Sequence, residues 1–251
     1  MRFFNWKNKH RDKNSIIYLF HGSQIIKLLK NSILSLRKIN KKIDIYIFCD
    51  EQNSKNIKIF SKKHHCKLVH LDIDLPNKDL KFKSNDWNIL MKKKVDAIIT
   101  ILNKGYKNVI YSDCDIVFLH DVENYIQSVS KVYNIGVQSD SQNVFPVEYC
   151  PGFMFFNQKS KYFLNLLKIK KSSGSDQFLF NKVVSKNYNL IKEIFILPES
   201  IFPNGLHYKN FFKKKIKYVL GYIKPYIFHA NYVLGINNKI KLLRKLSLWH
   251  L

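Results

Sequence analysis

Apolar and polar residues alternate along the chain in blocks that predict strands and helices in turn. Residues 15–20 form an apolar run rich in β-branched and aromatic side chains, which predicts a buried first strand. Residues 25–36 then repeat isoleucine and leucine at spacings of three and four, as one face of a helix does, with Ser23 as the predicted N-cap. A strand, a helix and a strand follow over residues 43–49, 53–63 and 67–73. This order predicts an α/β fold, with a mostly parallel central sheet flanked by helices.

Two carboxylates interrupt an apolar stretch at residues 108–119. A helix predicted around residues 91–102, with Gly105 just after its end, leads directly into this stretch. Side chains two apart on an extended chain project to the same side, so Asp113 and Asp115 can reach one divalent cation. Solvated acids in a turn are the alternative, but ligands of open α/β sheets bind beyond the carboxyl ends of strands. The position therefore favours a metal site at the end of a strand.

The second half of the chain predicts further strands and helices. The strands fall over residues 132–137, 152–157, 194–197 and 225–232, and a helix falls over residues 160–170. Another helix opens at Ser175, the predicted N-cap, with Asp176 in its first turn, where a negative charge is favoured. His229 lies near the end of the last strand, and Gly235 and Lys239 follow it by six and ten residues.

Composition narrows the class of protein. With 251 residues, 46% of them hydrophobic, the chain suits one globular domain, which we expect over residues 1–251 with a core at about 15–238. The four cysteines form no C-x-x-C pair, which argues against structural zinc and for a reducing compartment. We find no apolar signal segment at the start and no run of 18 apolar residues. We therefore expect a cytoplasmic protein without a signal peptide or a transmembrane segment.

The chain is strongly basic, with 43 Lys and Arg against 18 Asp and Glu and a formal net charge of +25. Such a charge attracts anions, whether nucleic acid, acidic membrane or phosphorylated small molecules. A general bias toward Lys, Asn and Ile is the favoured explanation, so we expect no specific nucleic-acid partner. The basic amphipathic segment 239–251 predicts a C-terminal helix docked by its apolar face, with peripheral contact to an anionic membrane as the alternative.

Several short groups of residues along the chain resemble the motifs of one enzyme family. They are Lys94, Gly105-Tyr106, residues 111–119, residues 152–157, Asp176-Gln177, residues 228–232, Gly235 and Lys239. In this order and spacing they resemble the nucleotide-diphospho-sugar transferase family, a set of GT-A-fold glycosyltransferases related to the retaining families 8, 34 and 77. The resemblance spans roughly residues 15–249. It implies a Rossmann-like single domain with a D-x-D motif at a strand end.

The resemblance assigns a metal site. Asp113 and Asp115 match the D-x-D motif, which in the family holds Mn²⁺ (or Mg²⁺) on the diphosphate of a nucleotide-sugar. His229 matches the third protein ligand, and carboxylate and imidazole groups suit Mn²⁺. Gly235 and Lys239 match residues near the diphosphate, where glycine permits close backbone approach and lysine adds a point charge. A packed histidine and a lysine of a basic tail are the simpler alternatives for His229 and Lys239.

The resemblance also assigns the sugar and the nucleoside of the donor. Lys94 matches a basic residue that faces the donor site, although Lys92 and Lys93 beside it leave a solvated helix face as the alternative. Asp176 and Gln177 match a pair that contacts the donor sugar, and they are the predicted catalytic residues. The nucleobase and the ribose are expected at the end of the first strand, at Phe20, His21 and Gly22.

These observations predict a metal-dependent glycosyltransferase that moves a sugar from a UDP-linked donor to a hydroxyl group of a carbohydrate or glycoconjugate acceptor, with retention of configuration. The stretch Cys150-Pro151-Gly152 departs from the family, which usually has a polar residue before that glycine. A haloacid-dehalogenase-like phosphatase with Asp113 as its nucleophile is one alternative, but its motif normally follows the first strand. A basic nucleic-acid-binding protein is the other, and the lysines and aromatics of residues 208–218 would serve it.

Overall fold

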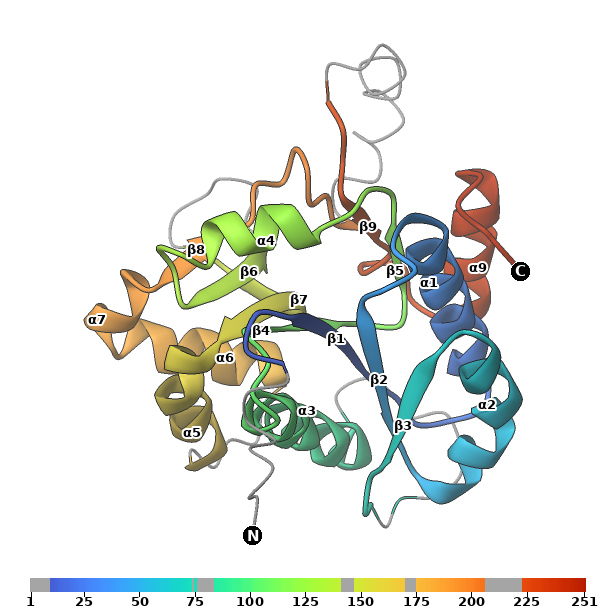
Figure 1. Cartoon of the computed structure of the whole chain (residues 1–251), viewed down its shortest axis with the longest axis horizontal. Coiled ribbons are helices and arrows are strands. Elements are labelled where there is room, and N and C mark those ends of the chain that lie inside the picture. The colour runs from blue at the N-terminus through green and yellow to red at the C-terminus, as the bar shows by residue number, and fades with distance from the viewer. Residues whose placement is uncertain (1–9, 74, 76–83, 141–146, 170–174, 206–222) are drawn as a thin grey trace, which may run out of the picture.

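A seven-stranded sheet lies at the centre of the protein in a computed structural model, which describes residues 10–73, 75, 84–140, 147–169, 175–205 and 223–251. The strands of this sheet are β1 (Asn14–Leu19), β2 (Asp44–Cys49), β3 (Cys66–His70), β4 (Asn108–Ser112), β6 (Ile135–Ser139), β7 (Tyr149–Asn157) and β8 (Ile194–Ile196). They lie in the order β3-β2-β1-β4-β7-β6-β8 (Figure 1). Within this sheet β7 runs antiparallel to both of its neighbours, and the other pairs are parallel. The predicted α/β fold with a mostly parallel sheet is confirmed.

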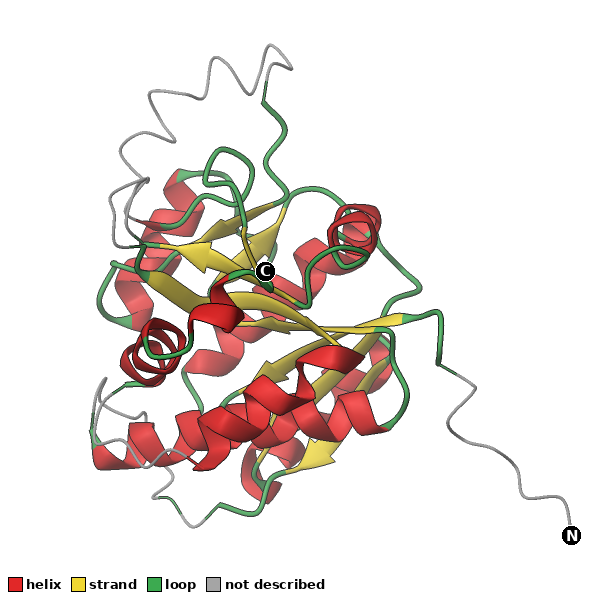
Figure 2. Cartoon of the chain, turned by 90° about the vertical axis from the view of Figure 1, so that its left-hand side faces the viewer, coloured by secondary structure: helices red, strands yellow, loops and turns green. Residues whose placement is uncertain are grey.

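Helices cover both faces of the sheet (Figures 1 and 2). One face carries α1 (Ile25–Ile39), α2 (Glu51–Lys63), α4 (Glu123–Val129) and α9 (Ile236–Lys245), and the other carries α3 (Asn85–Asn103), α5 (Lys161–Ile169) and α6 (Asp176–Ser185), which precedes the short α7 (Tyr188–Ile191). Successive residues of β1 enter the two cores in turn. Ile16 and Tyr18 pack in the first core, and Ile17 and Leu19 pack in the second. Burial on both faces explains why this strand is a continuous apolar run.

Some helix boundaries follow the predicted capping residues and others do not. Ser175 caps α6 as predicted, because its hydroxyl accepts a hydrogen bond from Phe178 N at 3.2 Å. The prediction that Ser23 caps α1 is wrong, since Gln24 is the N-cap and makes no capping hydrogen bond through its side chain. The C-terminal helix begins at Ile236 rather than at 239, so its first turn includes the predicted phosphate-binding lysine.

Two further strands form a separate antiparallel pair, β5 (Ile116–Phe118) and β9 (Ile227–His229). β9 is shorter than the strand predicted over residues 225–232, because its partner β5 has only three residues. The register pairs Ile116 with His229, and Ala230 N donates to Asp115 O at 3.1 Å. This pairing therefore brings His229 to the acids that follow β4.

The strand order locates the edge of the sheet where a ligand is expected. From β1 the chain continues to β2 and β3 on one side, whereas β4 lies on the other side of β1. Open α/β sheets bind ligands beyond the carboxyl ends of their strands at such a reversal. β4 ends at Ser112, directly before the two acids.

Candidate active site

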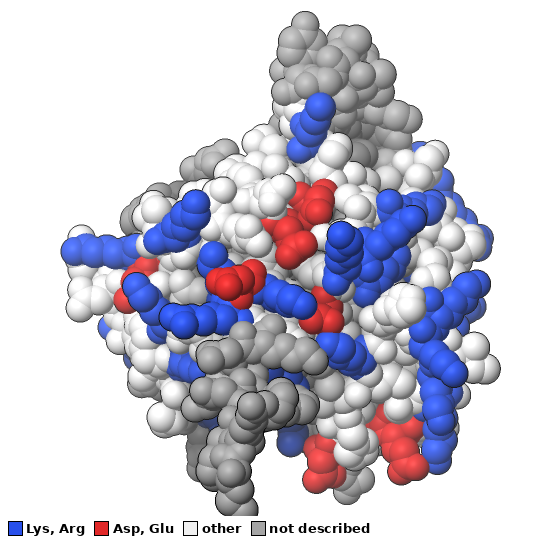
Figure 3. Space-filling view, viewed as in Figure 1, with Lys and Arg blue, Asp and Glu red and all other residues white. Residues whose placement is uncertain are grey.

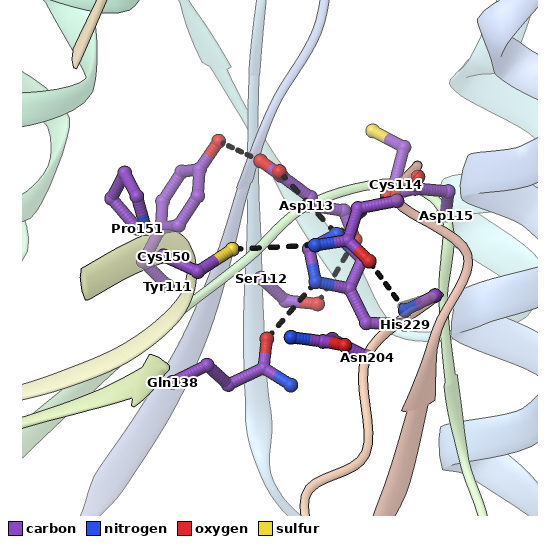
Figure 4. A network of polar contacts seen from close by, with 12 residues as sticks. Tyr111, Ser112, Asp113, Cys114, Asp115, Gln138, Cys150, Pro151, Asn204 and His229 are labelled. Atoms are coloured by element: carbon purple, nitrogen blue, oxygen red, sulfur yellow. Dashed lines mark hydrogen bonds and ion pairs between the residues drawn. The ribbon is translucent and has the colours of Figure 1, made fainter. Parts of the chain in front are cut away.

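Two carboxylates and one imidazole meet beyond the end of β4. His229 Nε2 lies 3.3 Å from Asp115 Oδ1 and 3.8 Å from Asp113 Oδ2. One ligand atom from each of the three residues lies within 4.8 Å of the others. Figure 4 shows the three side chains turned toward one another. The structure thus brings together all three residues predicted as metal ligands.

The orientation of His229 is fixed by a glutamine behind it. Gln138 at the end of β6 donates its amide N–H to Phe202 O at 3.0 Å, which turns Oε1 of the amide toward the imidazole. His229 Nδ1 lies 3.0 Å from that oxygen and therefore acts as the donor (Figure 4). Because Nδ1 is held by Gln138, Nε2 faces the two carboxylates, the orientation that a metal-binding histidine needs.

The charges around the two carboxylates are uneven. Asp115 is 6% exposed and forms an ion pair with Lys239. Burial alone would raise the pKa of Asp115, but Lys239 and His229 hold that pKa well below its usual range. Burial raises the pKa of Asp113, and the negative charge of Asp115 adds to the rise, although Lys94 opposes it. A cation between the carboxylates would remove their mutual repulsion, so the electrostatics fit a metal ion.

A glycine leaves the space that such an ion needs. Asp113 N donates to Gly152 O at 2.8 Å, so β7 lies directly against the three side chains. A Cβ atom on Gly152 would stand 2.2 Å from His229 Cε1 and 2.8 Å from Asp113 Oδ2. The donors around this space are carboxylate oxygens and an imidazole nitrogen, a set that suits Mn²⁺ and that Mg²⁺ accepts in part. The residues present therefore fit the metal that the sequence predicts.

Lys94 is part of the site and not of a solvated helix face. Its side chain on α3 is buried, with the residue 4% exposed, whereas Lys92 is exposed. Its ammonium group lies 2.5 Å from Asp176 Oδ2, 3.1 Å from Pro151 O and 3.9 Å from Asp113 Oδ1. Burial alone would lower the pKa of Lys94, but Asp176 and Asp113 raise it, so the lysine stays charged. Lys94 therefore links the D-x-D acids to the N-terminus of α6.

The Lys94–Asp176 pair gives a prediction that separates stability from catalysis. Lys94→Met leaves a carboxylate without its buried partner, and we expect it to lower the free energy of unfolding by about 3 kcal/mol. Lys94→Met combined with Asp176→Asn leaves no such charge and is expected to recover most of the lost stability. We expect both the single and the double variant to lack transferase activity. Urea denaturation of the wild type, the two single variants and the double variant measures the coupling energy between Lys94 and Asp176. If Lys94→Met and the double variant were equally stable, the predicted coupling between Lys94 and Asp176 would be contradicted.

The other predicted residues occupy distinct positions around Asp113, Asp115 and His229. Gln177 donates its amide to Asp140 at 3.0 Å and to Glu148 at 3.2 Å, so its amide faces these two carboxylates and not those of Asp113 and Asp115. Gly235 has a φ of +83°, which favours glycine, and its carbonyl accepts from Lys239 N at 3.1 Å. This turn starts α9 and directs Lys239 toward the D-x-D acids.

The predicted nucleoside residues lie at the carboxyl end of β1. Phe20 is 2% exposed and packs in the hydrophobic core, so its side chain is not on the surface of the protein. His21 Nδ1 lies 2.8 Å from Asp50 Oδ2, and Gly22 adopts a φ of +97°. A nucleoside at this place would meet the backbone of residues 20–22 and the pair formed by His21 and Asp50. Their role in binding stays a prediction.

Several residues of the cleft were missed by the sequence analysis. Asp140, directly after β6, accepts hydrogen bonds from Gln177 and from Asn204 at 2.8 Å and Asn231 at 3.3 Å. The rule that singled out Asp113, an acid at the carboxyl end of a strand, applies equally to this residue. Tyr111, the first residue of the motif at residues 111–119, donates its hydroxyl to Asp113 Oδ1 at 2.8 Å, a contact that the sequence analysis did not predict.

The order of the strands, the acids at the switch point and the histidine brought in by β9 are together typical of transferases that use nucleotide-sugars. A family model agrees with this class. The chain belongs to the nucleotide-diphospho-sugar transferase family, whose model matches residues 45–243. The family recognised from the sequence motifs is thereby confirmed.

Two relatives from Arabidopsis thaliana have names that describe a reaction. One, UDP-D-xylose:L-fucose alpha-1,3-D-xylosyltransferase 3, is 28% identical over 210 residues, which cover 74% of this chain and 53% of the relative. The other, UDP-D-xylose:L-fucose alpha-1,3-D-xylosyltransferase MGP4, is 26% identical over 195 residues, which cover 67% of this chain and 52% of the relative. The chain thus spans about half the length of these relatives.

Solved structures agree on the fold. Mouse xyloside xylosyltransferase 1 in its apo form superposes with a TM-score of 0.58 at 10% identity, covering 88% of this chain and 98% of that one. The galactosyltransferase LgtC, in complex with donor and acceptor sugar analogs, gives a TM-score of 0.54 at 9% identity, covering 92% and 95%. At such identities the likeness concerns the fold alone, and it confirms the predicted GT-A architecture.

The alternatives from the sequence find no support. The family match and the fold favour a glycosyltransferase over a phosphatase that would use Asp113 as its nucleophile. The basic and aromatic residues 208–218 lie outside the described part of the chain, as does the N-terminal stretch that was examined for a signal segment. Across the described residues, we find no helix with the length and apolar character that crossing a membrane requires.

Proposed function

We propose that this chain transfers a sugar from a UDP-linked donor to a hydroxyl group of a carbohydrate acceptor, and that the reaction needs a divalent cation and retains the anomeric configuration. The observation that carries the proposal is the convergence of Asp113, Asp115 and His229 at the switch point of the sheet. The names of the Arabidopsis relatives support UDP-xylose as the first donor to test.

Asp113, Asp115 and His229 would hold the cation, with Mn²⁺ preferred and Mg²⁺ as the alternative. When bound, the ion supplies Lewis-acid chemistry, because it neutralises charge that develops on the diphosphate leaving group. Gln138 holds the imidazole in the orientation that ligation needs. Tyr111 donates to Oδ1 of Asp113, which leaves Oδ2 on the side of His229.

Lys239 gives the site a second positive charge. Lys239 lies in the first turn of α9, directly after the N-cap Gly235 and the following residues, and it forms an ion pair with Asp115. A diphosphate bound at the acids would come within reach of this ammonium group, which would stabilise the growing negative charge during transfer. The backbone at Gly235 is open, because a Cβ there would meet only Asn238 Nδ2 at 3.7 Å.

Lys94, Asp176 and Gln177 would position the donor sugar. The ammonium group of Lys94 is held by two hydrogen bonds, to Asp176 and Pro151, and it lies 4.2 Å from the centre of the Tyr111 ring. A side chain held this firmly is already oriented before the substrate binds, which lowers the barrier of the reaction. Gln177 is the neighbour of Asp176 on α6 and points its amide toward Asp140.

The ion pair of Asp176 supports a front-face reaction. A carboxylate bound to Lys94 at 2.5 Å is a weak nucleophile, so a covalent sugar–enzyme intermediate at Asp176 is disfavoured. Instead, the bond between the anomeric carbon and the phosphate oxygen breaks while the acceptor oxygen bonds the same face of that carbon. The acceptor proton passes to the departing phosphate oxygen. Proton NMR of a fresh product tests this, since inversion at C1 would contradict it.

Calorimetric titration with UDP tests the donor site itself. With Mn²⁺ present we expect UDP to bind at least about tenfold more tightly than with EDTA, because a cation held by Asp113, Asp115 and His229 would offset the repulsion between the carboxylates and the diphosphate. GDP is the matched control for the nucleobase. Hydrolysis of UDP-xylose and other UDP-sugars then identifies the donor. The same weak binding of UDP with Mn²⁺ and with EDTA would contradict the proposal.

A further inference from the structure

Three neighbouring helices form a basic layer, which we define as residues 23–70 and 236–251, with α1, α2 and α9 as its helices. These 64 residues contain 15 Lys and Arg against 3 Asp and Glu, a net charge of +12, whereas the whole chain of 251 residues carries +25. About half of the net charge therefore lies in about a quarter of the chain. A uniform compositional bias does not produce this concentration.

The three helices form one continuous surface. Lys30 of α1 lies 5.4 Å above the ring of Phe60 of α2. On its other side α1 meets the segment after α9, since Asn31 donates to Leu248 O at 3.1 Å and Lys38 lies 2.8 Å from His250 Nδ1. Lys and Arg side chains gather over these helices, on the right of the view in Figure 3. Helices α1, α2 and α9 lie on the same side of the molecule in Figure 1, so the charges that they carry share that side.

Positive side chains dominate the outside of the basic layer. Its exposed basic residues include Lys27, Lys41, Lys42, Lys58, Lys62, Lys63, Lys241 and Arg244. Glu51 is the exposed acid within residues 23–70 and 236–251, and it already pairs with Lys55 at 2.9 Å. The other two acids of the layer are partly buried, and each already has a partner. Asp44 pairs with Lys67, and Asp50 contacts His21. The layer therefore presents little negative charge to an anionic partner.

The apolar residues of the layer distinguish between anionic partners. Ile59 on α2 is 86% exposed and stands between Lys58 and Lys62 in the sequence. Nucleic acid would favour exposed aromatic rings for stacking, and within the basic layer the large exposed apolar side chains are Ile59 and Leu251, neither of them aromatic. An aliphatic side chain surrounded by lysines suits the headgroup region of a bilayer. Leu242 and Leu243 are buried, so α9 contributes charge and not an inserting apolar face.

From these observations we infer that the basic layer docks the protein on an anionic lipid bilayer. The lysines approach the headgroups and Ile59 enters their boundary with the acyl chains. α9 begins at the active site, where Lys239 contacts Asp115, and continues into the layer. Docking in this way places the candidate active site next to the lipid surface, where an acceptor attached to a lipid would be presented to it. The inference does not depend on which sugar is transferred.

Vesicle sedimentation tests the docking. Vesicles of phosphatidylcholine with 30 mol% phosphatidylglycerol, about a third of the lipid, are expected to bind the protein at 50 mM salt and to release it at about 500 mM, where charges are screened. Vesicles of phosphatidylcholine alone are expected to leave it in the supernatant. Replacing Lys58, Lys62 and Lys241 by Gln should weaken binding at least about tenfold, because each lysine near an anionic leaflet contributes roughly a fivefold factor. Ile59→Ser should weaken it further.

A second triple variant controls for net charge. Lys182, Lys186 and Lys192 are exposed on α6, α7 and their ends, and Figure 1 shows these helices on the opposite side of the molecule from α2. Their replacement by Gln removes the same charge and is expected to leave vesicle binding nearly unchanged. Equal losses in the two variants would overturn the inference, as would binding of the wild-type protein to RNA or heparin but not to anionic vesicles. Mn²⁺-dependent UDP binding, measured on the same samples, shows separately whether the donor site works.

Discussion

Asp115→Asn is expected to reduce sugar transfer by about 10³-fold or more and to abolish the effect of Mn²⁺ on UDP binding. The amide keeps the size of the carboxylate but loses the charge that a divalent cation requires. Asp115 also pairs with Lys239 and lies 3.3 Å from His229 Nε2, so its carboxylate contacts both the lysine and the imidazole. The measurements are turnover of the UDP-sugar and calorimetry with Mn²⁺ and with EDTA.

A surface acid provides the matched control for Asp115→Asn. Asp96 on α3 pairs with Lys168 at 2.7 Å, and both side chains are more than a third exposed. Asp96→Asn makes the same chemical change away from the acids of the cleft, and we expect it to alter turnover less than about twofold. Thermal unfolding of both variants must show a folded protein. A folded Asp115→Asn variant that still binds UDP more tightly with Mn²⁺ would contradict the assigned metal site.

Gly152→Ala is expected to reduce activity by about 10²-fold or more while the protein stays folded. The new methyl group would lie 2.2 Å from His229 Cε1 and 2.8 Å from Asp113 Oδ2, in the space between the proposed metal ligands. The imidazole would have to move, which separates it from the carboxylates and lowers the affinity for Mn²⁺. Titration of Mn²⁺ followed by a spectroscopic or calorimetric signal measures that affinity directly.

Gly136→Ala distinguishes a blocked site from a strained sheet. A Cβ at Gly136 would lie 2.0 Å from Phe155 Cε1, within the core and away from the acids. We expect this variant to lose about 1–3 kcal/mol of stability from overpacking but to keep its dependence on Mn²⁺. Gly152→Ala should show the opposite pattern. Loss of stability without loss of Mn²⁺ affinity in Gly152→Ala would show that Gly152 has a role in packing alone.

The first half of the fold was predictable because its elements are local. β1 contains an apolar run, β2 has isoleucine at alternate positions, and α1 repeats its apolar residues with helical spacing, so each element can be recognised without its neighbours. The pairing of β5 with β9 was not predictable, because strands of three residues give almost no signal and join segments more than 100 residues apart. The N-cap of α1 was predicted at Ser23 but lies at Gln24, whose side chain makes no capping hydrogen bond. A helix start without a side-chain cap leaves no signal in the local sequence.

The candidate site was predictable where the chemistry is unusual. Two acids inside an apolar run are rare enough to attract attention, and the family motif added His229 and Lys239. The choice between Lys92, Lys93 and Lys94 needed the structure, because only burial separates three adjacent lysines. Gln138 and Asp140 were missed because a polar residue at the end of one strand is common, and their importance comes from partners far along the chain.

The pairing of β5 with β9 also determines when the site can form during folding. Asp113 and Asp115 belong to a segment whose β-α-β neighbours are close in sequence, and such local units form early as a chain is synthesised. The third proposed ligand, His229, and Lys239 arrive only with the last strand and helix, since Lys239 is 124 residues from its partner Asp115. A chain shortened before residue 227 would keep the strands of the seven-stranded sheet but lack Lys239 and one of the three proposed metal ligands, His229. We therefore expect tight binding of the donor nucleotide to appear only late in folding. It should also be the first property lost when the C-terminal segment detaches.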